Sequence, residues 1–144
     1  MTAGCGLCPD PQGKRRELLA PPLYDASWAV GILRGYEVPG WLALFPRRHA
    51  VSADALTSEE AASLGPKLRG LAAALRAVTA CDKVYTVSFG ERIRHWHLLV
   101  MAVPADMPSD VRGPALLSAK DMFRDLAAAK SIAGRVARVV AYGG

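Results

Sequence analysis

The residues best suited to chemistry are two cysteines and three histidines spread along the chain. Cys5 and Cys8 form a C-x-x-C pair, His49 lies in the middle, and His95 and His97 lie late, on either side of a tryptophan. Thiolates and imidazoles are the usual ligands of zinc, and a free imidazole can act as a nucleophile or a general base. The set therefore supplies four plausible zinc ligands and leaves one histidine for catalysis.

The C-x-x-C pair alone leaves several interpretations open. It fits a metal knuckle, or two solvent-facing cysteines with unconnected histidines elsewhere. A thioredoxin-like redox motif fits less well, because no helical pattern directly follows Cys8. Cys81, the remaining cysteine, is expected to be a small buried apolar residue at the start of a strand.

Length and charge restrict the class of protein. The 144 residues suit a single domain, residues 1–144. The net charge of +5 favours anionic partners such as phosphates, whereas the scattered basic residues give no reason to expect a nucleic-acid partner. The sequence shows no signal-peptide core and no membrane-spanning apolar run, so we expect a cytoplasmic protein with no membrane partner.

The elements that must position these residues can be predicted from hydrophobic patterning. Residues 1–24 are rich in glycine and proline and are expected to be irregular. Apolar runs predict strands at residues 27–33 and 41–45, joined as a hairpin, and at residues 83–89 and 95–103.

Two helices are predicted between and after these strands. A capping-box pattern begins at Thr57, and leucines then recur at helical spacing, although Gly65-Pro66 should kink or interrupt that helix. Ser118-x-x-Asp121 is expected to open a last helix of about 20 residues. Strands and helices in this order, with short connections, favour an α+β domain whose sheet is mostly antiparallel.

Alternation along the late strand places three residues on one face. His95, His97 and Leu99 share that face, and Trp96 and Leu98 lie on the other. Two neighbouring histidines suit a metal site, or a nucleophile with a supporting group. The alternative is a pair of half-exposed strand histidines.

The order of the motifs resembles the histidine-triad (HIT) superfamily of nucleotidyl hydrolases and transferases. Residues 40–49 end in Pro-Arg-Arg-His ahead of the acid-capped helix, and Tyr-Thr-Val-Ser-Phe-Gly at residues 85–90 precedes His95-Trp96-His97. The resemblance covers most of the chain. It implies a HIT-like, mostly antiparallel sheet of about five strands with two main helices.

In that family the signature is His-x-His-x-His, and the middle histidine attacks the α-phosphorus of a nucleotide. Here His95 takes the first position and His97 the middle one, while Leu99 replaces the third histidine. The Pro-Arg that usually follows the strand becomes Ala102-Val103.

The resemblance also suggests groups that bind the substrate. Ser88 stands where the family often has asparagine, and we expect Ser88, Arg92 and Arg94 to contact the phosphate. The alternative for the two arginines is a solvated turn. A second register would place Ile93 in the first position and make His95 the nucleophile; we prefer the first register for its spacing from Gly90.

The resemblance implies a structural zinc and a homodimer. The expected ligands are Cys5, Cys8, His49 and His95. The expected protein is an enzyme, a nucleotide phosphohydrolase or nucleotidyltransferase that uses His97 on a nucleoside phosphate or polyphosphate. Because of Leu99, the alternative is a divergent, non-hydrolytic protein that binds nucleotides, regulates, or performs an altered tailoring reaction.

Overall fold

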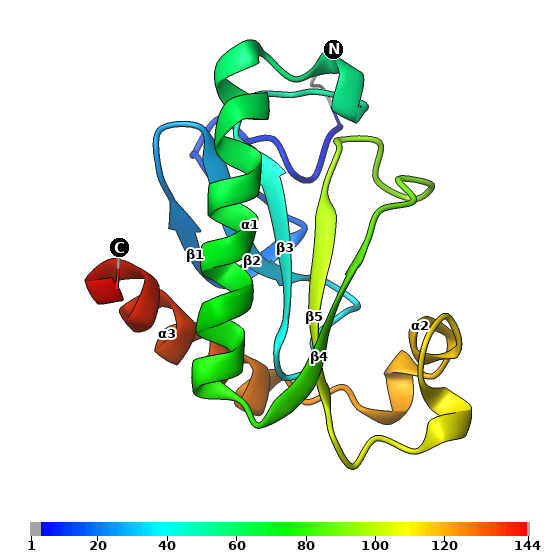
Figure 1. The fold of residues 1–144 in the computed structure, drawn as a ribbon. Coiled ribbons are helices and arrows are strands. Elements are labelled where there is room, and N and C mark those ends of the chain that lie inside the picture. Colours follow the sequence, from blue (N-terminus) through cyan, green and yellow to red (C-terminus); the bar gives the residue numbers. More distant parts are fainter. Residues whose placement is uncertain (1–3, 144) are drawn as a thin grey trace.

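The computed structural model describes residues 4–143, and its centre is one antiparallel sheet (Figure 1). The strands are β1 (Leu18–Tyr24), β2 (Trp28–Leu33), β3 (Trp41–Pro46), β4 (Cys81–Val87) and β5 (Leu98–Pro104). They lie in the order β1-β2-β3-β5-β4, and all neighbouring pairs are antiparallel. The expected α+β class, with a five-stranded sheet, is confirmed.

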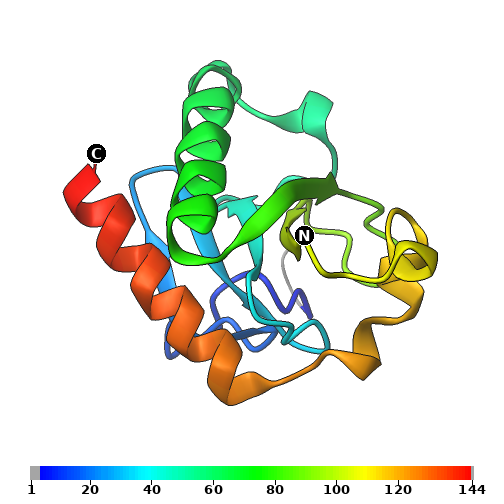
Figure 2. The same cartoon turned by 60° about the horizontal axis from the view of Figure 1, so that its bottom comes forward.

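Helices lie on both sides of this sheet. The α-helices are α1 (Ser58–Val78), α2 (Ala115–Ser118) and α3 (Leu126–Gly143), and short 3-10 turns occur at Ala53–Ala55, Ser109–Val111 and Lys120–Met122. Figure 2 shows α1 and α3 together on one side and α2 on the other. None of the helices within residues 4–143 has the length and apolar character needed to cross a membrane.

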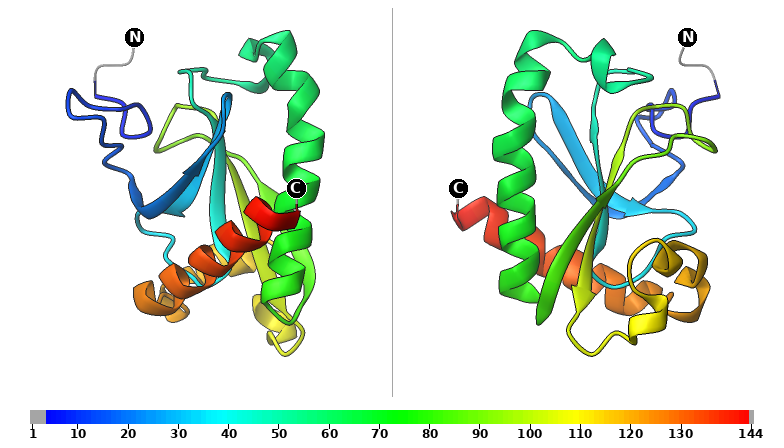
Figure 3. Two further views of the ribbon diagram at one scale, coloured as in Figure 1. Left: turned by 90° about the vertical axis from the view of Figure 1, so that its left-hand side faces the viewer. Right: turned by 45° about the vertical axis from the view of Figure 1, so that its right-hand side comes forward.

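The central strands β2 and β3 are buried on both faces. On one face, Leu44 packs with Leu75 of α1 and Val136 of α3. On the other face, Phe45 packs with Leu7 from the N-terminal segment, which Figure 3 shows across the sheet from α1. Burial on both sides explains why these strands are continuous apolar runs in the sequence.

Helix α1 begins as its sequence predicts. The Thr57 hydroxyl accepts a hydrogen bond from the Glu60 backbone N–H at 3.1 Å, and the Glu60 carboxylate accepts one from the Thr57 N–H at 2.8 Å. A kink or an interruption was expected at Gly65-Pro66, and the interruption is wrong, because the helix continues to Val78. Both residues lie on the exposed side of the helix, where water can satisfy the backbone carbonyl that a proline leaves without a partner.

The N-terminal segment contains a strand that the sequence did not predict. Residues 18–24 were expected to be irregular, but they form β1, which pairs with β2 at the edge of the sheet. The register of this pairing shifts between Leu19 and Leu23, on either side of Pro21-Pro22. Edge strands with an irregular register can accommodate prolines, which lack the N–H that a regular ladder needs.

Two predicted boundaries are also wrong. The strand expected at residues 95–103 begins only at Leu98, so both late histidines lie in the irregular segment that leads into β5. The last helix does not open at Ser118, which ends α2. It begins at Leu126, and the Asp125 carboxylate accepts a hydrogen bond from the Ala128 N–H at 3.1 Å, as a helix cap does.

Candidate functional site

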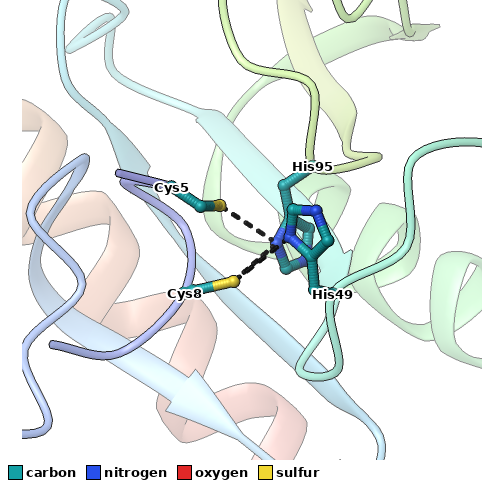
Figure 4. A group of neighbouring side chains, drawn as sticks. All are labelled: Cys5, Cys8, His49 and His95. Atoms are coloured by element: carbon teal, nitrogen blue, oxygen red, sulfur yellow. Dashed lines mark hydrogen bonds between the residues drawn. The ribbon is translucent and has the colours of Figure 1, made fainter. Parts of the chain in front are cut away.

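The four residues expected to bind zinc lie together in the structure. Cys5 and Cys8 approach from the N-terminal segment, His49 follows β3, and His95 precedes β5 (Figure 4). His95 Nδ1 lies 3.5 Å from each cysteine sulfur, and His49 Nδ1 lies 3.3 Å from the sulfur of Cys8. All four ligand atoms lie within 4.8 Å of one another, so the group could hold a metal ion.

The spacing and chemistry of this cluster fit a tetrahedral zinc. With ordinary Zn–S and Zn–N bond lengths, sulfur and nitrogen ligands are separated by about 3.6 Å. Burial, together with the neighbouring Cys5 thiol, raises the pKa of the Cys8 thiol to about 11, and burial lowers the pKa of His95 to about 4. The imidazole is therefore neutral, as a ligand must be, while the thiols need a nearby cation to ionise.

Backbone and aromatic contacts orient His95 within the cluster. Its side chain is fully buried, and its Nε2–H donates to the Pro46 carbonyl at 2.8 Å. The Nδ1 lone pair is thereby left facing the two sulfurs, an arrangement common to metal-binding histidines. The ring also packs edge-on against Phe45, with centroids 5.4 Å apart.

Arg48 and Glu60 hold the turn that carries His49. Arg48 donates to both carboxylate oxygens of Glu60, at 2.9 and 3.3 Å. These hydrogen bonds from Arg48 hold the pKa of the Glu60 carboxyl below its ordinary value. Glu60 is only 5% exposed, so this ion pair ties the start of α1 to the ligand turn.

His97 lines a separate cavity of about 380 Å³. Its Nδ1 lies 2.8 Å from the backbone carbonyl of His95 and must donate to it, which leaves the lone pair on Nε2. Burial lowers the pKa of His97 below its ordinary value and favours the neutral ring. The other lining residues are Leu33, Tyr36, Val87, Phe89, Gly90, Glu91, Arg92, Ile93, Leu99, Leu117 and Ser118.

The expected substrate-binding residues occupy three different positions. Arg92 lines the His97 cavity, and its guanidinium also contacts Glu17 at 3.3 Å. The Ser88 hydroxyl instead donates to the His97 carbonyl at 2.7 Å, so it holds the backbone beside the candidate nucleophile. Arg94 lines a neighbouring cavity, which the candidate ligands Cys5, His49 and His95 also line.

The third triad position is apolar in its surroundings as well as in its side chain. Leu99 is 5% exposed and packs with Trp41 and Leu116 while it lines the His97 cavity. Ile93 is likewise buried in an apolar cluster, and His95 lies in the metal cluster. The positions of these residues favour the register in which His97 is the middle residue.

Several lining residues, among them Tyr36, Phe89 and Ser118, are not predicted as site residues from the sequence. Tyr36 lies in the turn between β2 and β3, Phe89 follows β4, and Ser118 ends α2. Phe89 belongs to the motif at residues 85–90, but that motif gives no reason to expect its side chain at the site. Ser118 reaches the cavity only through the packing of the segment between β5 and α3.

Solved structures share the fold of this chain, although no protein-family model and no curated protein matches the sequence. A histidine-triad protein from Sinorhizobium meliloti has 23% identity and a TM-score of 0.65, over 79% of this chain and 84% of that one. A hypothetical histidine triad nucleotide-binding protein from Sulfolobus tokodaii has 12% identity and a TM-score of 0.63, over 85% of both chains. A uridylyltransferase has 20% identity and a TM-score of 0.62, over 83% of this chain and 40% of that one. The fold of this chain is therefore the fold of the histidine-triad proteins.

Proposed function

We propose that the chain is a divergent histidine-triad enzyme that hydrolyses or transfers a nucleotidyl or related phosphoryl group. The observation that carries the proposal is the setting of His97. It lines a cavity, and its Nδ1 is held by the His95 carbonyl, so the lone pair is on Nε2. A histidine with this tautomer is suited to attack phosphorus. The histidine triad nucleotide-binding protein and the uridylyltransferase of the same fold support a nucleotide substrate.

The reaction would proceed by double displacement. The Nε2 lone pair of His97 attacks the phosphorus, a P–N bond forms, and the P–O or P–N bond to the leaving group breaks with its electron pair. The leaving group takes a proton from water. A second nucleophile, water or another phosphate, then attacks phosphorus, the P–N bond breaks, and its electron pair returns to Nε2. An attacking water gives its proton to the hydroxide that the first step left. Arg92, which lines the cavity, would offset the negative charge.

The metal in this proposal is a structural zinc. Its ligands would be Cys5, Cys8, His49 and His95, a closed set of four with no open position. A zinc bound there would fasten the N-terminal segment to the ends of β3 and β5. It would take no part in the reaction, but it would fix the backbone from which His97 is presented.

Turnover of defined substrates tests the proposal. Wild-type protein should hydrolyse an adenosine phosphoramidate or a dinucleoside polyphosphate, and His97→Ala and His97→Asn should both abolish turnover. Asparagine can still donate to the His95 carbonyl, so it separates nucleophilic attack from loop structure. Unchanged melting temperature and metal content would show that both variants are folded. Equal rates in wild type and His97→Asn would reject the proposal.

A nucleotide-binding protein without turnover is the second candidate. Leu99 favours it, because an isobutyl group cannot donate a hydrogen bond to phosphate. Binding of a nucleoside phosphate by wild type and by His97→Asn, with no turnover in either, would identify this function. A homodimer and a cytoplasmic location complete the proposal, and sedimentation and cell fractionation test them.

A further inference from the structure

A second cavity, of about 520 Å³, adjoins the His97 cavity. The two share part of their walls: Val87, Phe89, Leu117 and Ser118 line both. The remaining residues of the second cavity are Tyr85, Thr86, Met101, Gly113 and Pro114. None of its lining residues is charged, whereas the charged residues Glu91 and Arg92 line the first cavity together with His97.

The register of β4 and β5 makes the floor of both cavities continuous. Leu99 pairs with Val87, and Met101 pairs with Tyr85, and these four side chains pack in one apolar cluster. Leu99 and Val87 line the first cavity together with His97. Successive rows on one face of a strand are about 6.6 Å apart, so the floor continues by about 6.6 Å from the Leu99 row to the Met101 row. The Tyr85 hydroxyl accepts a hydrogen bond from the Gly113 N–H at 2.9 Å, which fixes the wall opposite β4.

The two cavities and their shared apolar floor form one groove. We propose that this groove binds an extended apolar group attached to the reacting phosphate, so that the substrate is an amphiphilic phosphate ester. The inference rests on the proposed function for its charged end, where the phosphate meets His97 and Arg92. Leu99 is then a specificity residue: it begins the apolar floor at the position where a third histidine would make the site polar. An apolar cavity that adjoins a charged one fits a ligand that has a charged part and an apolar part.

Phe89 is the exposed wall of this groove. Its side chain is 75% exposed and lines both cavities. Met122 is equally exposed, at 75%, but lines neither cavity. Phe89→Ala and Met122→Ala therefore remove similar exposed apolar surface at two sites, only one of which belongs to the groove.

Calorimetric titration with ethyl, butyl, hexyl and octyl phosphate tests the inference without requiring turnover. In wild type, the dissociation constant should fall by about two- to fourfold per added methylene until the chain reaches the end of the groove. Phe89→Ala and the isosteric Val87→Thr should flatten this dependence, and Met122→Ala should preserve it. Turnover that depends on His97 but affinity that ignores chain length would overturn the inference and leave the proposed function standing.

A second copy of this chain is the competing occupant. Sedimentation of wild type, Phe89→Ala and Met122→Ala measures it. A dimer that dissociates only in Phe89→Ala, together with no effect of alkyl length, would show that the groove is a subunit contact and would overturn the inference. An oligomeric state that is the same in all three proteins, together with the length dependence, supports the substrate groove.

Discussion

The imidazole Nδ1 of His97 lies 2.8 Å from the carbonyl oxygen of His95, whose own ring lies in the metal cluster. The backbone of the candidate metal ligand therefore sets the tautomer of the candidate nucleophile. Because one residue separates them, a displacement of His95 also displaces the hydrogen-bond acceptor of His97. A displacement of the ligand residues should therefore change the position of His97 in its cavity, although none of the four ligand residues lines that cavity.

Ser88 holds the other side of the same backbone, through its 2.7 Å hydrogen bond to the His97 carbonyl. Ser88→Ala should lower kcat by about three- to tenfold, since one ordinary hydrogen bond that positions His97 is lost. Metal content should not change. Ser88→Thr, which keeps the hydroxyl, should restore the rate.

Ser131→Ala provides the matched control, because Ser131 is exposed on α3 across the sheet. A Ser88→Ala protein with wild-type kcat and KM would show that the hydrogen bond has no positioning role. A change confined to KM would instead favour direct contact with the substrate, as the sequence alone suggested.

Loss of the cysteine ligands should remove the metal and weaken the fold. Purified wild type should contain about one zinc per chain. Cys5→Ser combined with Cys8→Ser should abolish binding and lower the melting temperature by about 10 °C, because the cluster fastens the N-terminal segment to the sheet. Plasma emission spectrometry and thermal unfolding measure the two effects.

Cys81→Ala is the control for thiol chemistry elsewhere. Cys81 packs on the face of the sheet that α1 and α3 cover, and it is not one of the four clustered ligand residues. Its replacement should leave the zinc content unchanged. Stoichiometric zinc in the double Cys5, Cys8 variant would exclude the proposed ligand set.

The Glu60–Arg48 pair should make stability depend on pH. Hydrogen bonds from Arg48 lower the pKa of Glu60 in the folded protein, so its contribution is complete above the unfolded value of 4.5 and is lost as pH falls through the lower folded value. At neutral pH, Glu60→Gln should reduce the free energy of unfolding by about 1.5 kcal/mol. The difference should shrink toward zero once the pH lies below the folded value, because the wild-type carboxyl is then protonated in both states.

Urea unfolding of wild type, Glu60→Gln and Glu59→Gln checks this dependence. Glu59 is the exposed neighbour in the same first turn of α1, and its variant should show little change at either pH. A Glu60→Gln deficit that stays constant from neutral to acidic pH would mean that packing, and not the carboxylate charge, causes it.

The sequence predicts those elements whose stabilising interactions lie within one short segment. The capping box at Thr57 and the apolar runs of β2 and β3 each lie within one short segment, so their consequences can be read directly. Strand β1 and the start of α3 could not be predicted in the same way. The first depends on pairing with β2 despite two prolines, and the second depends on Asp125, which caps α3 after a turn.

The same difference applies to the candidate site, where the ligand residues could be predicted and the walls of the groove could not. The resemblance to the histidine-triad proteins implied that Cys5, Cys8, His49 and His95 share a metal site, and these residues do lie together. The groove beside His97 was not foreseen, because its walls come from β4 and from the segment around α2. Apolar residues at such positions are not distinguishable from core residues until the packing is known.

Replacement of Leu99 by histidine should exchange one specificity for another. The new imidazole would line the His97 cavity as a hydrogen-bond donor, so hydrolysis of an adenosine phosphoramidate should rise by about tenfold or more. It would also interrupt the apolar floor, so the gain in affinity with alkyl length should diminish.

Because Leu99 packs with Trp41 and Leu116, the buried imidazole should cost about 1–3 kcal/mol of stability. Leu99→Met keeps the apolar floor and should retain the wild-type preference. If Leu99→His remains folded and neither property changes, position 99 does not contact the substrate.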